Sequence, residues 1–111
     1  MRSERLNQLN EFLKESPKDP FLKYALATEY LKLENEDMAL AGYVDLVENH
    51  ADYAGTYYHL GKLYEKLGQI ENARSTYNKG IVICQQGRKM HALGELKGAL
   101  NLLDGFDEDE Y

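Results

Sequence analysis

The sequence predicts an all-α fold of about six antiparallel helices, and three observations support this. Its two prolines, Pro17 and Pro20, both stand near the N-terminus, so no proline interrupts a helix beyond residue 20. Apolar residues recur at three- and four-residue spacing along most of the chain, as in amphipathic helices. The chain also resembles itself when it is shifted by 34 residues.

The internal repeat aligns residues of similar size at apolar positions. The aligned pairs are Leu26 with Leu60, Ala27 with Gly61, Tyr30 with Tyr64, Leu33 with Leu67, Ala39 with Ala73, and Tyr43 with Tyr77. We therefore expect two copies of a two-helix unit, at residues 20–53 and 54–87, because a periodic signal of this length is typical of helical repeats.

The expected helices follow in chain order, and the first spans residues 3–16. Its apolar side is formed by Leu6, Leu9, Phe12 and Leu13. This helix precedes the first copy and has no partner of its own within residues 1–19.

In the first copy, Asp19 is expected to cap a helix that begins at Pro20. Asn35 is expected to cap the second helix of the copy, which would bury Met38 and Tyr43 among other apolar residues. Both starts are local signals, because a side chain that accepts a hydrogen bond stands just before each apolar pattern.

In the second copy, the first helix is expected to end at Gly68, and the second to end before Gly87. Small residues such as Ala27 and Gly61 lie inside the apolar stripes, where they let two helix backbones approach closely. A glycine inside a helix costs roughly 1 kcal/mol relative to alanine. Close packing beside large tyrosines therefore explains Gly61 better than flexibility does.

Two motifs of the second copy carry a resemblance to a known family. They read Tyr57-x₂-Leu60-Gly61-x₂-Tyr64 and Ala73-x₃-Tyr77. This pattern resembles the tetratricopeptide repeat (TPR) consensus W-x₂-L-G-x₂-Y…A-x₃-F…P. The departures are Lys23, where the first copy should open with an aromatic residue, and Ala51 and Gln85, where closing prolines are expected.

The resemblance implies a short right-handed α-solenoid. Residues 1–19 would form an N-terminal half-repeat, and residues 88–103 a capping helix in which Met90-x₂-Leu93-Gly94 echoes the start of the second copy. The alternative is an unrelated helical bundle.

The resemblance also implies a function. TPR arrays usually hold a peptide or a partner helix in a concave groove lined by the first helix of each pair, so the chain would be a protein-binding adaptor or scaffold. The groove residues carried over by position are Phe21, Tyr24, Thr28 and Leu31 from the first copy, Tyr58, Lys62 and Glu65 from the second, and Arg88, His91 and Glu95 from the terminal helix. Independently, Tyr24 and Tyr58 lie off the core stripes, where tyrosines suit recognition; the alternative is that they pack partly against neighbouring helices.

The expected ligand is a peptide that contains acidic and aromatic residues, because Lys62 and Arg88 accompany the groove tyrosines. Some TPR modules instead grip the C-terminal carboxylate of heat-shock chaperones. Here the matching positions carry Tyr24, Thr28 and His59, which disfavours that adaptor role.

The alternative function is self-association, with a homodimer formed through the terminal helices. The last helix carries leucine on more than one side, at Leu93, Leu96, Leu100, Leu102 and Leu103. Intramolecular capping of the array competes with this interpretation.

Charge excludes some partners. The net charge is −6, and the last eight residues carry five acids, which leaves 14 acids and 13 bases in residues 1–103. A body so nearly neutral argues against nucleic acid. Residues 104–111 are expected to form a disordered acidic tail, which would itself be an acidic-aromatic peptide able to compete for the groove.

No chemistry-bearing pattern points to an enzyme. The three histidines and Cys84 lack metal-ligand spacing, and no phosphate loop or nucleophile motif is present, so no metal or cofactor is expected. No apolar stretch approaches the length of a membrane span. A single cysteine excludes an internal disulfide, which together with the other features favours a cytoplasmic protein.

Overall fold

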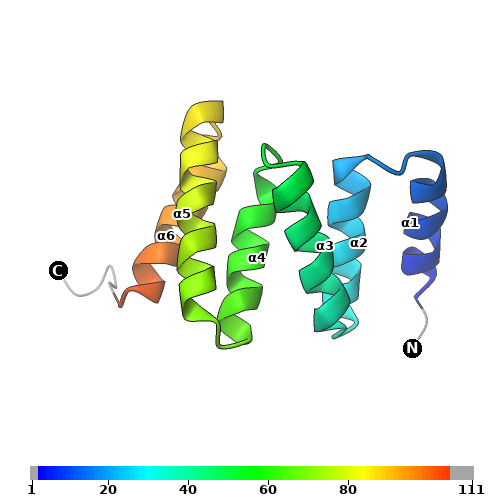
Figure 1. Cartoon of the computed structure of the whole chain (residues 1–111), viewed down its shortest axis with the longest axis horizontal. Helices are drawn as coiled ribbons and strands as arrows, with labels where there is room; N and C mark the ends of the chain where they lie inside the picture. The colour runs from blue at the N-terminus through cyan, green and yellow to red at the C-terminus, as the bar shows by residue number, and fades with distance from the viewer. Residues whose placement is uncertain (1–2, 106–111) are drawn as a thin grey trace. The chain divides into compact units, whose positions relative to one another are not determined.

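The computed structural model describes residues 3–105, and within that range the chain forms six α-helices and no strand (Figure 1). The helices are α1 (Glu4–Glu15), α2 (Pro20–Lys32), α3 (Glu36–Asn49), α4 (Gly55–Lys66), α5 (Ile70–Gly87) and α6 (Met90–Leu103). The chain divides into two compact units, Met1–Tyr53 with α1 to α3 and Ala54–Tyr111 with α4 to α6. Within each unit consecutive helices run antiparallel. The all-α prediction is confirmed.

The helices of the first unit begin at residues whose side chains accept a hydrogen bond from the first turn. The backbone N–H of Leu6 donates to Ser3 Oγ at 3.2 Å, and that of Phe21 donates to Asp19 Oδ1 at 2.9 Å. The same contact joins Met38 to Asn35 Oδ1 at 3.2 Å. The starts predicted at Asp19 and Asn35 are therefore confirmed, and each cap contributes about 1 kcal/mol.

The first helix of each pair is followed by a residue in the left-handed conformation. Gly68 has φ of 77° after α4, as its residue type predicts, and Glu34 has φ of 61° at the same repeat position after α2. The expectation that α5 ends before Gly87 is wrong. Gly87 remains helical, and Arg88 takes φ of 56°, because the N–H of Lys89 returns to the carbonyl oxygen of Cys84 at 2.9 Å.

The core of the first unit lies between α2 and α3, where the two backbones approach closely. A Cβ added at Gly42 would lie 2.9 Å from the Cβ of Ala27. Tyr43 and Leu46 of α3 are fully buried beside this contact, and α1 buries Leu9 against α2. Met38, which was expected to be buried, is 46% exposed because it lies in the first turn of α3, next to the connecting turn.

In the core of the second unit, two tyrosine side chains pack directly against glycines of the facing helix. A Cβ added at Gly61 of α4 would lie 2.1 Å from Cε1 of Tyr77 in α5, and one at Gly80 of α5 would lie 2.5 Å from Cβ of Tyr57 in α4. Both tyrosines are fully buried. The prediction that small residues permit close helix approach is confirmed here. The helix α6 packs on α5 and also contacts α4, with Leu96 in the core.

The C-terminal end corrects one expectation. Asp104, assigned to a disordered tail, ends α6 and accepts hydrogen bonds from Arg74 of α5 at 2.7 and 3.1 Å. Of the predicted tail, residues 106–111 lie outside the described range. In residues 3–105, no helix combines the length and the apolar composition that crossing a membrane requires.

Candidate functional site

The expected groove residues of the first unit all lie on α2 but differ in exposure. Phe21 is 57% exposed, whereas Tyr24, Thr28 and Leu31 are half-buried. The ring of Tyr24 has its centroid 5.5 Å from that of Tyr53 and 6.1 Å from that of Tyr43, and both pairs are tilted. Tyr24 therefore packs against neighbours on one side and keeps part of its surface open. We call these four α2 residues the α2 patch.

Thr28 is linked to the core of the first unit. Its Oγ1 lies 2.8 Å from the Oη of Tyr43, and either hydroxyl can donate. Burial raises the pKa of Tyr43, an effect that the hydrogen bond to Thr28 opposes. The Tyr43 phenol is therefore neutral near pH 7, and the hydroxyl pair fixes the Thr28 side chain at the edge of the α2 patch.

In the second unit, Tyr58, Lys62 and Glu65 follow one another along α4. The Nζ atom of Lys62 lies 5.7 Å from the centroid of the half-buried Tyr58 ring, within the range of a cation–π contact. The same Nζ lies 3.7 Å from Oε2 of Glu65, at the long end of an ion pair. We call these three residues the α4 patch.

Glu65 has a stronger partner than Lys62. It accepts a hydrogen bond from the Oη of Tyr77, and burial together with this carboxylate raises the pKa of Tyr77. Because Glu65 is held toward the core, Lys62 keeps an ammonium group that its own helix only partly neutralises. Its side chain is 40% exposed, so a ligand carboxylate can reach it.

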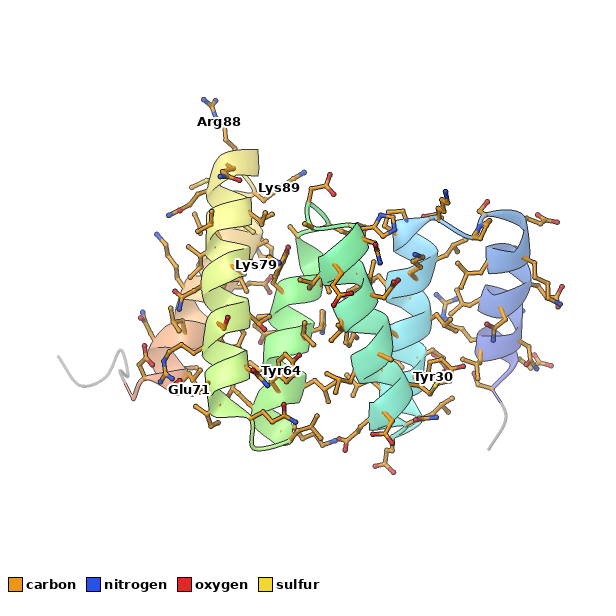
Figure 2. All side chains as sticks on the ribbon, in the orientation of Figure 1. Tyr30, Tyr64, Glu71, Lys79, Arg88 and Lys89 are labelled. Atoms are coloured by element: carbon orange, nitrogen blue, oxygen red, sulfur yellow. The ribbon has the colours of Figure 1, made fainter. Side chains whose placement is uncertain are left out.

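Two of the three remaining expected residues lie on α6. Nε2 of the exposed His91 is 3.9 Å from Oε1 of Glu95, and Glu95 acts electrostatically on His59 of α4. The structure therefore brings these parts of α4 and α6 near each other within one unit. Arg88 was expected on the terminal helix, which is wrong: it ends α5 in a left-handed conformation and points away from the helix end (Figure 2).

His59 predicts a pH dependence of stability. Burial lowers the pKa of its imidazole below the ordinary value of about 6.5, while Glu95 opposes the shift. Below about pH 6.5 the unfolded chain therefore binds a proton that the folded chain takes up only at lower pH, so stability is present above this pH and falls as pH drops through the window. Urea unfolding at pH 7.5 and 5.5 should show this loss, and His59→Gln should reduce it. An identical loss in both proteins would assign the pH dependence to other groups.

The first unit contains a pocket that was not predicted from the sequence. It lies between α2 and α3, and Lys23 and Asp45 form an ion pair of 3.1 Å at one end of it. The signal that could have found it is Lys23 itself, a lysine where the second copy has the buried Tyr57. Elsewhere, within residues 3–105, no three His, Cys, Asp or Glu side chains are grouped so that they could hold a metal ion.

Known proteins share this architecture. The sequence model of the tetratricopeptide repeat family matches residues 54–86. A tetratricopeptide repeat domain protein from Salinibacter ruber is 46% identical over 81% of this chain and 100% of its own, and its crystal structure superimposes with a TM-score of 0.77. The chain belongs to the tetratricopeptide repeat family.

Two further solved structures are similar to this chain. The solution structure of a tetratricopeptide repeat domain protein from Salinibacter ruber is 44% identical over 86% of this chain and 96% of its own, with a TM-score of 0.78. A Bordetella parapertussis protein, 22% identical over 94% of this chain and 90% of its own, has the same fold with a TM-score of 0.78. No curated protein matches the chain in sequence. TPR proteins are generally non-catalytic, so the fold supports a role in protein–protein interaction.

Proposed function

We propose that this TPR chain binds a peptide or a partner helix through the first helices of its pairs and carries out no catalysis. The observation that carries the proposal is the α4 patch, where the half-buried ring of Tyr58 lies beside the Lys62 ammonium group, which Glu65 only partly neutralises. A ring of this kind offers a large contact area with little conformational entropy to lose. The α2 patch adds a second aromatic surface at Phe21 and Tyr24.

The chemistry of the patches favours a ligand with aromatic and acidic residues. The ring of Tyr58 can stack with an aromatic side chain, and Lys62 can pair with a carboxylate. Arg88 is exposed at the end of α5, where it would add long-range attraction for an acidic chain. His91 and Glu95 on α6 extend the same unit's polar surface. The proposed mode is therefore an aromatic anchor with a charged neighbour.

The binding prediction uses a synthetic peptide with the acidic-aromatic sequence of residues 106–111, FDEDEY, as the probe. Tyr58→Ala should weaken binding of this peptide about tenfold, because loss of a contact anchor costs on the order of 1–2 kcal/mol. Lys62→Ala should weaken binding less and should flatten its dependence on salt. Amide shifts in a ¹⁵N-labelled full chain, followed during titration, measure both effects.

Lys79→Ala is the matched control for the charge change. Lys79 is an exposed lysine on α5, outside both patches, and its removal alters the net charge as Lys62→Ala does. Equal weakening by the two lysine variants would mean that the peptide senses only net charge. Shifts confined to α3 and α5 would contradict the proposal directly.

A second candidate function is self-association through the terminal helices. Met90 and Leu102 of α6 are 67% and 64% exposed, and Phe12 of α1 is 55% exposed. Gly94 stands at the α6 position that corresponds to Gly61, but a Cβ added there would meet nothing within 4 Å, so this α6 face is open among the described residues. Light scattering at several concentrations separates the candidates, because a constant monomer mass excludes self-association.

A further inference from the structure

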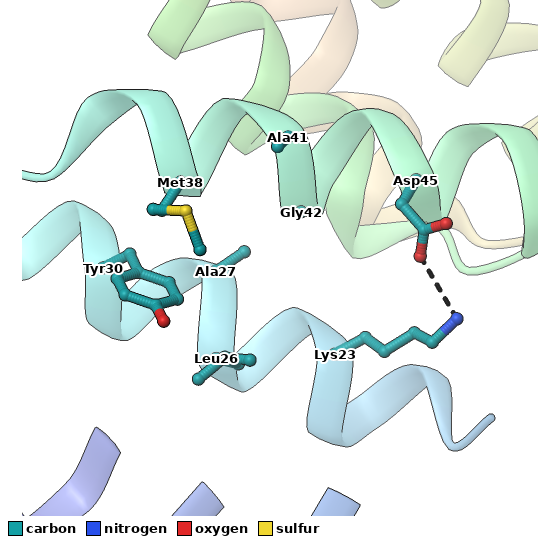
Figure 3. Close-up of a pocket in the computed structure, with 8 residues that line it drawn as sticks. All are labelled: Lys23, Leu26, Ala27, Tyr30, Met38, Ala41, Gly42 and Asp45. Carbon is teal, nitrogen blue, oxygen red and sulfur yellow. Dashed lines mark hydrogen bonds and ion pairs between the residues drawn. The ribbon is translucent and has the colours of Figure 1, made fainter. Parts of the chain in front are cut away.

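The pocket of the first unit is a largely apolar groove between α2 and α3 (Figure 3). Its volume is about 260 Å³, and all of its lining residues come from α2 and α3. The close approach of Ala27 and Gly42 forms its centre. Tyr30 and Met38 lie at one end, and the Lys23–Asp45 ion pair lies at the other. The groove is therefore mostly apolar, and its charged side chains lie at one end only.

The identity of residue 23 helps to explain why this space is open. In the second copy the corresponding residue is Tyr57, whose ring is fully buried over Gly80. In the first copy this residue is Lys23, whose side chain is unbranched and whose Nζ donates a hydrogen bond to Asp45 Oδ2 at 3.1 Å. A four-carbon stem fills less volume than a phenol ring. Met38, at the other end, is 46% exposed and does not close the groove.

At the polar end of the groove, Lys23 can still donate hydrogen bonds, whereas Asp45 already accepts hydrogen bonds from two side chains. Burial alone would raise the pKa of Asp45, but hydrogen bonds from Lys23 and Asn49 hold it below its usual value. Asp45 is therefore ionised and already well supplied with donors. The Lys23 ammonium carries three N–H groups and donates one of them to Asp45. A ligand that brings a carbonyl or carboxylate oxygen to this end would complete the ammonium's hydrogen bonding.

We propose that this pocket is a second binding site, separate from the α2 and α4 patches, that takes one large apolar side chain of a partner polypeptide. The neighbouring main-chain carbonyl of that polypeptide accepts a hydrogen bond from Lys23. A cavity of about 150 Å³ is enough to hold benzene, so this groove has room for a phenylalanine or leucine side chain. Its apolar walls exclude a charged side chain, because burying an unpaired charge is costly.

The α2 helix separates the two kinds of site. The pocket uses Lys23, Leu26, Ala27 and Tyr30, whereas the α2 patch uses Phe21, Tyr24, Thr28 and Leu31. No residue is shared, so the pocket can be occupied whether or not the patches bind a peptide. Failure of one proposal therefore leaves the other open to test.

The experiment titrates N-acetyl-phenylalaninamide into the full chain and follows methyl resonances. Saturable shifts are expected at the Cε methyl of Met38 and the Cβ methyls of Ala27 and Ala41, which line the groove. N-acetyl-glycinamide, which lacks the ring, should cause no such shifts. Ala41→Leu places a longer side chain in the groove and should weaken binding at least tenfold.

Ser75→Leu is the matched control, because Ser75 occupies the position of Ala41 in the second copy and is exposed. It should leave binding at the groove methyls unchanged. Lys23→Met keeps the unbranched stem and removes the ammonium group, so it should weaken binding about fivefold. If circular dichroism shows that Ala41→Leu does not fold, Lys23→Met alone tests the pocket proposal. Shifts of the groove methyls without saturation, or equal binding to Lys23→Met and the unaltered chain, would overturn the proposal.

Discussion

Replacing Tyr57 with alanine is expected to lower the free energy of unfolding by about 3–5 kcal/mol. The ring of Tyr57 is fully buried. A Cβ added at Gly80 of α5 would lie only 2.5 Å from the Cβ of Tyr57, so Tyr57 packs directly against this glycine. Leu96 of α6 lies beside the same glycine. Alanine would leave a cavity among α4, α5 and α6 that these helices cannot close without moving. Urea unfolding followed by circular dichroism measures the loss.

Lys23→Ala is the control for this prediction, because Lys23 occupies the same repeat position in the first copy. Lys23 is partly exposed and joins Asp45 in an ion pair of 3.1 Å, an interaction worth at most about 1 kcal/mol at such a surface. The loss should therefore be several-fold smaller than for Tyr57→Ala. Equal losses would mean that the buried ring does not anchor the second unit.

Because the chain has two compact units, the loss of unfolding free energy should be measured for each unit separately. A chain of two units need not unfold in one step, so a single midpoint can hide a local effect. Amide resonances of α4 to α6 should report the loss caused by Tyr57→Ala, because the cavity lies among these helices. Resonances of α1 to α3 should follow Lys23→Ala instead.

The starts of α2 and α3 were predictable from the sequence because their causes are local. Asp19 and Asn35 accept hydrogen bonds from backbone groups two or three residues away, so the capping residue and the apolar pattern that follows are enough to locate the start. The 34-residue period was predictable for a related reason. Ala39 and Ala73, for example, meet the same packing requirement in the two copies, and both residues are fully buried.

Helix ends were harder to predict where no glycine marks them. Gly68 and Glu34 take the same left-handed conformation at the same repeat position, but only glycine adopts it at no steric cost. After α5 the left-handed residue is Arg88, although Gly87 is adjacent. The prediction from residue type therefore ended α5 too early and assigned Arg88 to the terminal helix, whereas Arg88 follows the last residue of α5.

The candidate site was less predictable than the fold because it depends on side-chain contacts between helices. The apolar periodicity predicts that Tyr24 lies outside the core stripe. It does not predict that the Tyr24 ring packs beside the rings of Tyr43 and Tyr53. Spacing likewise indicates that Lys62 follows Tyr58 by one turn, but not that Glu65 is drawn away toward Tyr77. The pocket depends on the direction in which the Lys23 side chain turns, which no sequence pattern specifies.

Replacing Gly61 with alanine is expected to destabilise the chain by about 2 kcal/mol. A Cβ there would lie 2.1 Å from Cε1 of Tyr77 and 2.6 Å from two further ring atoms. The ring cannot move aside easily, because it is fully buried and its Oη is hydrogen-bonded to Glu65. Overpacking at such a site costs up to about 3 kcal/mol, and the better helix propensity of alanine returns about 1 kcal/mol.

The same substitution at Gly94 is expected to have the opposite sign. Gly94 corresponds to Gly61 in the repeat, but a Cβ added there meets nothing within 4 Å. Gly94→Ala should therefore stabilise the chain by up to about 1 kcal/mol through helix propensity alone. Urea unfolding of both variants tests the pair. If Gly61→Ala were also stabilising, the ring of Tyr77 would not be seated on Gly61, and close packing would no longer explain a glycine inside α4.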